Sequence, residues 1–322
     1  MSFRTRVIVN PAAAAGATRR RWPELQRALA RVLSSWEVEF TTRPHHATEL
    51  AREAVENGVQ MIVCVGGDGT MNEIVTGLFG ASSEGISDSL IRSDVVIAPV
   101  RQGTGGDFAR FMGLSGRLPD AVEHLKGEST RPCDIGLVEF TDHNGGRRRR
   151  AFLNIASFGM SGLVDEKVNG STKVLGGTTS FLVGLGQALM AYRPQRVRVS
   201  VDGSPFYEDR MVTAAVANGQ YFGGGMHFAP RATFDDGLFD IVVQVKSGLK
   251  EVLSIRDLYS GRIVDWPTVR TARGRRIDAV PLDAEDRVLL DVDGEQPGCL
   301  PATFRILPSA VRLKVSAAHT PS

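Results

Sequence analysis

The stretch Val65-Gly66-Gly67-Asp68-Gly69-Thr70-Met71-Asn72-Glu73 determines how the rest of the chain is interpreted. It follows an apolar run at residues 61–65 and precedes a helical pattern at residues 74–79, which predicts strand, glycine-rich turn and helix. Three glycines in four residues allow positive φ and close approach of a ligand, so that successive N–H groups can bind phosphate near a helix N-terminus. Thr70 and Glu73 fit a capping box at the start of that helix.

Asp68 lies inside the predicted turn. A carboxylate on an anion-binding loop indicates a metal ion or a proton, so the sequence favours a nucleotide bound with Mg²⁺. A tight turn with a solvated aspartate is the alternative. Neither G-x-x-x-x-G-K-[ST] nor G-x-G-x-x-G occurs, which excludes the P-loop and the dinucleotide fingerprint.

Bulk properties indicate a globular protein of two domains. The 322 residues have 42% hydrophobic content and a formal net charge of +2, so composition implies no nucleic-acid partner. The three cysteines are dispersed, which fits a reducing compartment and argues against disulfides or a zinc site. The N-terminus lacks a signal-peptide core, and the most apolar long window, residues 174–192, is too polar to span a bilayer. We therefore expect a cytoplasmic protein.

Residues 1–133 alternate between strands and helices, which predicts a parallel α/β sheet. Strands are expected at 6–10, 37–41, 61–65 and 95–99, with helices starting at Pro23 and spanning 47–57. Ligands of such sheets bind beyond the carboxyl ends of the strands. Asn10, Thr42, the turn 66–70 and a second glycine-rich loop, 102–110, fall at those ends.

Residues 134–307 predict a β-rich, mainly antiparallel, sandwich-like second domain, and the tail 308–322 could return to the first. A hairpin turn is expected at 142–146, and helices near 174–191 and 248–260. Strands are expected at 135–140, 150–155, 196–201, 207–216, 238–245, 269–271, 276–280, 287–292, 303–307 and 311–315. An edge strand of this domain could pair with a second copy in a homodimer.

The segment 291–295, Asp-Val-Asp-Gly-Glu, ends a predicted strand. It is either an exposed turn or a pair of carboxylates of the kind that accepts a proton from an attacking hydroxyl. The segment 235–237, Asp-Asp-Gly, would by itself be a turn.

Several of these blocks resemble the diacylglycerol kinase catalytic-domain family, the bacterial soluble lipid kinases related to sphingosine and ceramide kinases. Residues 66–70 resemble a signature that this family shares with NAD kinases and 6-phosphofructokinases, and Asn72-Glu73 matches the lipid-kinase version. The loop 103–110 is similar to G-T-x-N-D-F-A-R, with Gly106 where the family has Asn. Further similar blocks lie at 154–162, 217–226, 229–240 and 293–295.

The resemblance implies an NAD kinase/phosphofructokinase-like α/β domain, a β-rich lipid-substrate domain, and transfer of the γ-phosphate of ATP to a lipid hydroxyl at a membrane surface. Glu295 would be the proton acceptor with Asp293 beside it, and Asp134 would support Asp68 and the Mg²⁺. A structural Mg²⁺ would bind Asp236 and the backbone carbonyls of Thr233 and Leu238. The nucleotide would contact Asn10, Thr42, Gly66, Gly67, Asp68, Gly69, Thr70, Asn72, Gly103 and Thr104.

Two sets of side chains bear on a membrane substrate. Arg147–Arg150 and the group Arg270, Arg273, Arg275 and Arg276 are either solvated strand faces or contacts to an anionic membrane, worth about 1 kcal/mol per residue. Phe181, Leu182, Leu185, Leu189 and Met190 are either core or a lipid-facing wall. His45, His46 and His227 have no metal-ligand spacing.

Two other functions compete with a lipid kinase. An NAD kinase shares the first turn, but the position of Asn72-Glu73 and the D-G-E block argue against it. A lipid-binding regulator without catalysis is suggested by Gly106, although Asp68, Asp236, Asp293 and Glu295 are retained. Diacylglycerol, phosphatidylglycerol, monoacylglycerol and sphingoid bases all offer a suitable hydroxyl.

Overall fold

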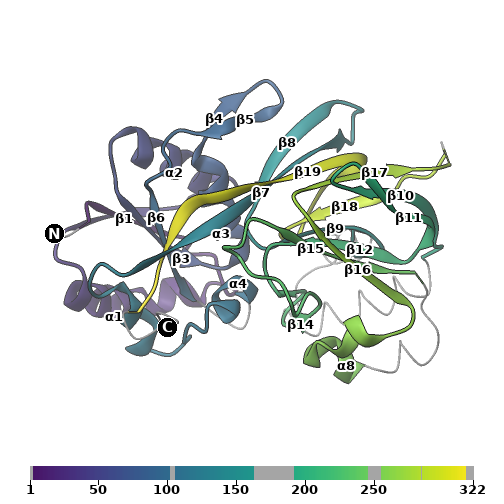
Figure 1. Ribbon diagram of the computed structural model, residues 1–322. Coiled ribbons are helices and arrows are strands. Elements are labelled where there is room, and N and C mark those ends of the chain that lie inside the picture. Colours follow the sequence, from purple (N-terminus) through teal and green to yellow (C-terminus); the bar gives the residue numbers. More distant parts are fainter. Residues whose placement is uncertain (1–2, 102–105, 163–191, 246–254, 284, 317–322) are drawn as a thin grey trace. The chain divides into compact units, whose positions relative to one another are not determined.

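The computed structural model describes residues 3–101, 106–162, 192–245, 255–283 and 285–316 (Figure 1). The chain forms two units: Met1–Ile135 with Pro308–Ser322, and Gly136–Leu307. Two long strands, β7 (Thr130–Asp142) and β19 (Glu295–Lys314), contribute residues to both units. The chain therefore leaves the first unit once and returns to it at its end.

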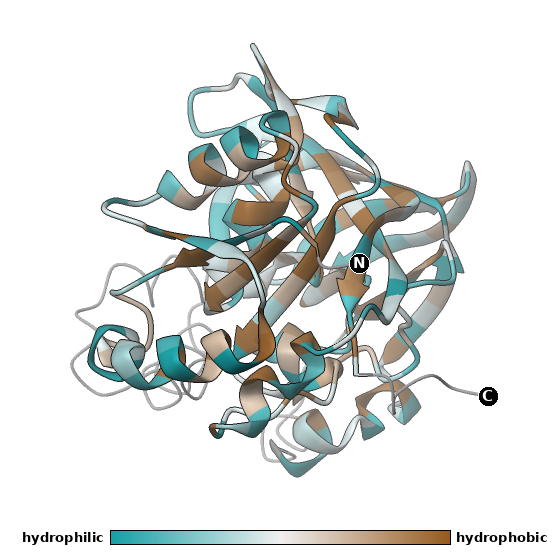
Figure 2. Ribbon diagram, turned by 90° about the vertical axis from the view of Figure 1, so that its left-hand side faces the viewer, coloured by the Kyte–Doolittle hydropathy of each residue, from teal (hydrophilic) through white to brown (hydrophobic). Residues whose placement is uncertain are grey.

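The first unit is built on a parallel sheet, as the alternating pattern predicts. Its strands run in the order β2 (Trp36–Phe40), β1 (Thr5–Val9), β3 (Met61–Gly66) and β6 (Val96–Arg101), and the end of β19 adds a further parallel partner to β6. Every residue of β1 and β3 is buried. In Figure 2, brown hydrophobic segments predominate in the strands of this unit. Helices cover both faces of a sheet of this kind, so its strands can be apolar on both sides.

Helices follow the strands of this sheet. They are α1 (Ala17–Val32), α2 (His46–Glu56), α3 (Asp68–Gly77), α4 (Asp107–Phe111) and a 3₁₀ turn at Asp120–Leu125. Leu25 and Leu29 of α1 are fully buried in the same core cluster as Val7 and Val63. The apolar face of the predicted first helix thus packs against the sheet.

Two local predictions for the first unit are wrong. The first helix begins at Ala17 rather than at Pro23, because Gly16 supplies a left-handed N-cap (φ +79°) and the helix tolerates the proline within it. A hairpin of β4 (Phe79–Ser82) and β5 (Gly85–Leu90) follows α3, which the helical pattern through residue 79 did not indicate.

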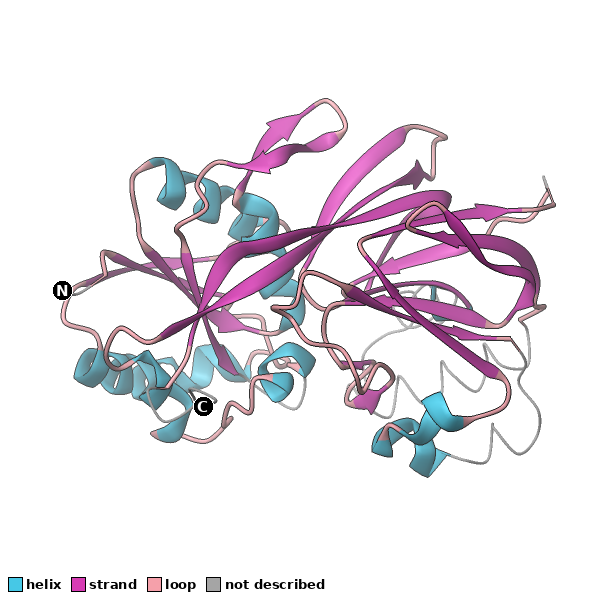
Figure 3. Ribbon diagram, in the orientation of Figure 1, coloured by secondary structure: helices cyan, strands magenta, loops and turns pink. Residues whose placement is uncertain are grey.

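The second unit is antiparallel throughout its described pairings (Figure 3). The hairpin between β7 and β8 lies at the expected turn. Among the described residues, the elements after β7 are β8 (Arg147–Phe152), β9 (Ile155–Gly159), β10 (Gln195–Val201), β11 (Ser204–Met211), β12 (Thr213–Ala217), β13 (Tyr221–Phe222), β14 (Met226–His227), β15 (Phe239–Gln244), α8 (Ile255–Ser260), a 3₁₀ turn (Arg262–Asp265), β16 (Val269–Gly274), β17 (Arg276–Pro281), β18 (Leu289–Val292) and β19.

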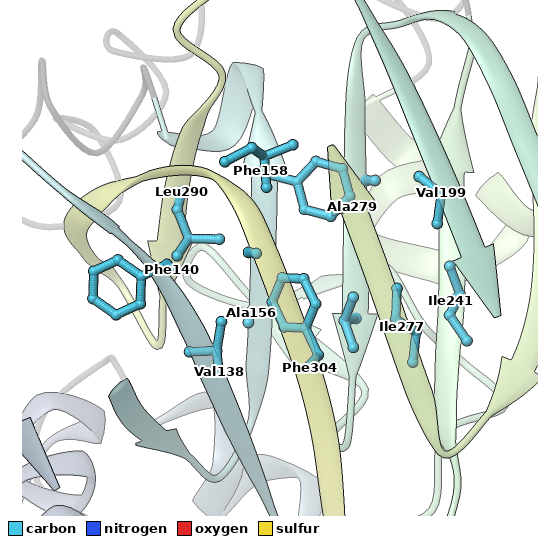
Figure 4. Close-up of a cluster of buried hydrophobic side chains, with 14 of the residues drawn as sticks. Val138, Phe140, Ala156, Phe158, Val199, Ile241, Ile277, Ala279, Leu290 and Phe304 are labelled. Carbon is cyan, nitrogen blue, oxygen red and sulfur yellow. The ribbon is translucent and has the colours of Figure 1, made fainter. Parts of the chain in front are cut away.

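A continuous apolar cluster lies between these strands (Figure 4). Phe304 of β19 packs against Phe158 of β9 and Phe152 of β8, with ring centroids 6.1 Å and 6.4 Å apart. Ile277 and Leu290 belong to the same cluster and are fully buried. Side chains from strands far apart in sequence thus form one core, typical of a β-sandwich.

Two strand predictions after residue 200 need correction, and two predicted helices are wholly or partly untested. The strand expected at 207–216 is two strands, because Val212 lies between β11 and β12 and donates its N–H to Gln244 O. The strands expected at 303–307 and 311–315 are parts of β19, which continues through Ser309 because that N–H donates to Asp134. The helix expected at 174–191 and residues 248–254 of the next one lie outside the described residues.

None of the helices in the described part of the chain combines the length and the apolar character that crossing a bilayer requires.

Candidate functional site

The first glycine-rich turn joins β3 to α3. Gly66 ends β3, Gly67 is the N-cap of α3 with φ −101°, and Gly69 lies within the helix. None of the three has positive φ, so the expectation of left-handed backbone here is wrong. A Cβ at Gly66 would lie 2.7 Å from Thr70 Cβ, whereas a Cβ at Gly67 or Gly69 would meet nothing within 4 Å. Gly66 is therefore needed for packing, and the other two leave the backbone open to a ligand.

The predicted capping box does not form. Glu73 accepts hydrogen bonds from the backbone N–H groups of His45 and Ala47, both at 3.0 Å, at the start of α2. Thr70 Oγ1 instead accepts a hydrogen bond from Asn10 Nδ2 at 2.9 Å. Glu73 therefore caps the neighbouring helix, a partner that the local spacing of Thr70 and Glu73 does not reveal.

Asp68 connects the first turn to the end of the second glycine-rich loop. Its Oδ2 accepts N–H bonds from Gly106 at 3.1 Å and Asp107 at 2.8 Å, and its Oδ1 accepts one from Phe108 at 3.4 Å. These N–H groups open α4, so Asp68 caps that helix from another segment. Burial raises the pKa of the Asp68 carboxyl above its ordinary value, although the three amides favour the ionised form.

Gly106, the departure from the family motif, has φ +90°. A left-handed position favours glycine, and asparagine is among the few other residues that tolerate it. Glycine is therefore compatible with this backbone conformation and lacks the polar side chain that the family has here. Gly103 and Thr104 lie outside the described residues.

The remaining candidates of the first unit fall into three places. Asn10 joins the first turn through Thr70, and Asn72 is buried within α3. Thr42 follows β2, is exposed, and donates its backbone N–H to His46 Nδ1 at 3.2 Å. Its hydroxyl oxygen also lies 3.2 Å from that nitrogen. Asp134 is fully buried on β7 and accepts the Ser309 N–H at 2.7 Å; in the described structure it is not a hydrogen-bond partner of Asp68.

The D-x-D-G-E block forms the two-residue turn between β18 and β19. Asp293 (φ +50°) and Gly294 (φ +86°) are both left-handed, the geometry of a type I′ hairpin turn. The Asp293 carboxylate accepts the backbone N–H groups of Leu153, Asn154 and Ile155 at 2.9, 3.1 and 2.9 Å. Both Asp293 oxygens are thus used to hold the segment that leads into β9.

Asp291 and Glu295 flank this turn. Asp291 is buried and accepts hydrogen bonds from Gly294 N at 2.8 Å and Ser157 Oγ at 2.9 Å. Glu295 is more accessible, with 37% of its side chain exposed, and its Oε2 lies 2.7 Å from Arg150 Nη2. Sequence reasoning considered Arg150 only as part of a basic run and did not identify it as the partner of Glu295, because the two residues lie 145 positions apart.

The Asp236 turn contains the oxygen donors expected of a magnesium site. The Asp236 carboxylate accepts hydrogen bonds from Thr233 Oγ1 and, at 3.0 Å, from Leu238 N, and it also pairs with Arg273. Within the described ranges, no cluster of three His, Cys, Asp or Glu side chains is arranged to hold a metal ion. A guanidinium therefore supplies the positive charge at this carboxylate.

Most of the basic groups are paired with carboxylates. Arg147 and Arg149 pair with Glu139, and Arg148 with Asp142. Arg276 similarly pairs with Asp278. The residues 181–190 that were considered for a lipid-facing wall lie outside the described residues.

Comparisons with known proteins agree with this architecture. Residues 4–138 match the family model of the diacylglycerol kinase catalytic domain, and residues 154–315 match that of the YegS C-terminal NAD kinase beta sandwich-like domain. A diacylglycerol kinase of Bacillus subtilis (strain 168) is 27% identical over 304 residues, covering 94% of this chain and 92% of its own. A protein of Chromohalobacter salexigens named "Probable lipid kinase YegS-like" is 30% identical, covering 90% of this chain and 88% of its own.

Solved structures show the same fold. The crystal structure of a diacylglycerol kinase from Bacillus anthracis aligns with a TM-score of 0.71 at 22% identity, covering 99% of this chain and 100% of that one. Yeast NADH kinase aligns with a TM-score of 0.53 at 10% identity, covering 99% of this chain and 85% of that one. With both domain models matched in order, the chain belongs to the family of diacylglycerol kinases and YegS-like lipid kinases.

Proposed function

We propose that this protein is an ATP- and Mg²⁺-dependent lipid kinase that phosphorylates the hydroxyl of diacylglycerol or a similar lipid at a membrane surface. The observation that carries the proposal is the contact of Asp68 with three backbone amides at the start of α4. This contact joins the ends of two glycine-rich turns that follow the adjacent parallel strands β3 and β6. Nucleotides bind at such strand ends in α/β sheets.

The nucleotide would lie against the start of α3. The open backbone at Gly67 and Gly69 and the positive end of that helix suit phosphate oxygens. Asn10, Gly66, Thr70 and Asn72 would support the turn, and Thr42, Gly103 and Thr104 would complete the contacts.

Two carboxylates suit Mg²⁺ by their donor chemistry. Burial raises the pKa of the Asp68 carboxyl and so disfavours its ionised form. A divalent cation nearby would have the opposite effect and favour the ionised form. Asp134 would support Asp68 and the ion. Asp236 and the backbone carbonyls of Thr233 and Leu238 are hard oxygen donors. An ion there would share the Asp236 carboxylate with Arg273 or displace the guanidinium from it. When bound with ATP, Mg²⁺ neutralises charge on the phosphates during transfer.

Glu295 would accept the proton of the lipid hydroxyl. Its carboxylate is partly exposed, whereas both oxygens of Asp293 are engaged by amides. In this reaction the hydroxyl oxygen bonds to the γ-phosphorus, the bond from that phosphorus to the β,γ-bridging oxygen breaks, and the proton moves to Glu295. ADP leaves with the electron pair. Asp293 would hold the turn that presents Glu295.

The same proposal places the enzyme at an anionic membrane, where its lipid would be found. Arg270 and Arg275 are exposed, and the described residues offer neither side chain an ion-pair partner, so these two are the better candidates for headgroup contact. A homodimer would form through an edge such as β11, which pairs with β10 on one side in the described structure. Co-sedimentation with vesicles of anionic and of neutral lipid tests the first point, and light scattering tests the second.

Transfer of labelled phosphate from ATP to a panel of lipids in mixed micelles tests the activity, with Mg²⁺ present and NAD in a parallel reaction. Glu295→Gln should abolish labelling. Glu208→Gln is the matched control, because Glu208 also forms a 2.7 Å ion pair with an arginine in the second unit. Labelling of NAD alone would refute the lipid-kinase proposal, and full activity of Glu295→Gln would refute the base assignment.

A further inference from the structure

The ion pair between Arg150 and Glu295 joins two strands of the second unit. Arg150 lies on β8 opposite Val138 of β7, and Glu295 is the first residue of β19, opposite Val292 of β18. Arg150 Nη2 and Glu295 Oε2 are 2.7 Å apart, with the two side chains 23% and 37% exposed. A charged hydrogen bond of this length fixes both the distance and the direction between the groups.

The backbone of Glu295 is fixed by its turn, but its side chain needs a separate constraint. Asp293 and Gly294 are held by backbone and Asp291 contacts, which place the Cα of Glu295. A glutamate side chain retains several rotatable bonds beyond its Cα, so this placement alone leaves the carboxylate free to move. Among the described residues, Arg150 is the group that hydrogen-bonds the Glu295 carboxylate.

We infer that Arg150 is a positioning residue for Glu295, which holds Oε2 so that Oε1 is directed to the proton of the lipid hydroxyl. This inference rests on the proposed function. In the reaction described above, Arg150 touches neither the phosphate nor the hydroxyl. Its contribution is to keep the proton acceptor in one orientation, and misplacement of a reacting group by about 1 Å can lower the rate roughly 10²-fold.

A second Arg–Glu pair provides a matched control. Arg198 of β10 and Glu208 of β11 face each other across a hairpin, with Nε and Oε2 also 2.7 Å apart. Their side chains are 49% and 50% exposed, and neither takes part in the proposed phosphoryl transfer. An ion pair with solvent access contributes little to stability. Both pairs retain such access, so neither Arg150→Ala nor Arg198→Ala should prevent folding.

Steady-state kinetics of the full-length chain test the inference. Arg150→Ala should lower kcat by about 10- to 100-fold, with KM for ATP and lipid changed by less than about threefold, because the loss affects orientation in the reaction rather than substrate binding. Arg198→Ala should keep both constants. Arg150→Lys should recover part of the rate, since lysine restores the charge without the planar fork. Added guanidinium at a non-denaturing concentration should partly rescue Arg150→Ala and leave Arg150→Lys unchanged.

The outcomes separate this inference from the proposed function. If Glu295→Gln is inactive while Arg150→Ala matches Arg198→Ala, Arg150 does not position the base, although the kinase assignment stands. If Glu295→Gln is active, the base assignment fails irrespective of Arg150. If Arg150→Ala does not fold, Arg150→Lys decides: a reduced kcat with unchanged KM supports the inference, and a kcat equal to that of the wild type overturns it.

Discussion

Asp68 and Asp293 use the same device in the two units, with different surroundings. Each carboxylate accepts three consecutive backbone N–H groups, Gly106 to Phe108 for Asp68 and Leu153 to Ile155 for Asp293. Asp68 lies in a helix and caps another helix, and burial raises its pKa. Asp293 lies in a left-handed turn and holds a segment between strands. Each motif aspartate therefore shapes the backbone within its own unit, whatever chemistry it also performs.

Replacing Asp293 should have the largest effect on stability. Asp293→Ala leaves three amides without their acceptor and places alanine at φ +50°, so we expect a loss of about 4 kcal/mol in the free energy of unfolding. Asp293→Asn, which tolerates left-handed backbone and keeps one acceptor oxygen, should lose about half as much. Urea unfolding measures both, and equal losses would show that the amide bonds contribute little.

Lys314 in the first unit is the reverse case: a buried cation that donates hydrogen bonds to three backbone carbonyls. Its neighbour His124 makes the stability of that unit sensitive to acid. The buried Lys314 ammonium donates to the carbonyls of Lys126, Ser129 and Val315 at 3.0, 3.1 and 3.3 Å. Burial, with the Lys314 charge nearby, lowers the pKa of His124 to about 4. A neutral His124 thus favours the fold, and this contribution is complete above the unfolded pKa of about 6.5 and is lost as the pH falls toward 4.

Wild-type protein should therefore lose about 3 kcal/mol through His124 between pH 7 and pH 4. His124→Leu removes the titrating group, so its unfolding free energy should fall less over the same range. Urea unfolding at several pH values gives the difference between the two proteins. Parallel curves for wild type and His124→Leu would contradict this assignment.

Asp68→Ala should cost less than Asp293→Ala. It also removes three hydrogen bonds, but burial disfavours the Asp68 charge and raises the pKa of this carboxyl, so part of the stabilisation from those bonds is offset. We expect a loss of about 2 kcal/mol with a loss of ATP affinity, since the end of the second loop is released. Urea unfolding and calorimetric titration with ATP measure the two effects, and a larger loss than for Asp293→Ala would reverse the comparison.

Gly69→Ala should have the smallest effect on stability, and it should stabilise the protein rather than destabilise it. Gly69 lies in α3 with open space around it, so alanine should stabilise the helix by about 0.5–1 kcal/mol. Gly66→Ala, whose Cβ would press on Thr70, should destabilise by about 1–3 kcal/mol. A stable Gly69→Ala protein with weakened ATP binding would locate the phosphates at this turn; unchanged ATP affinity would move them elsewhere.

Features that depend on residues close together in the sequence could be predicted, whereas contacts between distant segments could not. The alternation of strands and helices over residues 1–133 predicted the parallel sheet, because parallel neighbours need a crossover connection between them. The partner of Glu73 was missed because α2 competes for its carboxylate with the nearer helix start. β19 was divided in two because Pro308 and Ser309 resemble a break, whereas Asp134 holds the chain there. The Arg150–Glu295 pair depends on strand pairing across 145 residues, which no local spacing reports.

The return of β19 to the first unit affects the order in which the chain can fold during translation. Leu313 of β19 pairs with Ile97 of β6. The parallel sheet of the first unit therefore gains β19 only after the residues that follow Pro308 have left the ribosome. All of the second unit, Gly136–Leu307, is synthesised before that point. Domains usually fold in the order of their synthesis. Here the segment made first is completed last, and the module inserted within it can bury its own core while the earlier segment still waits for its final strand.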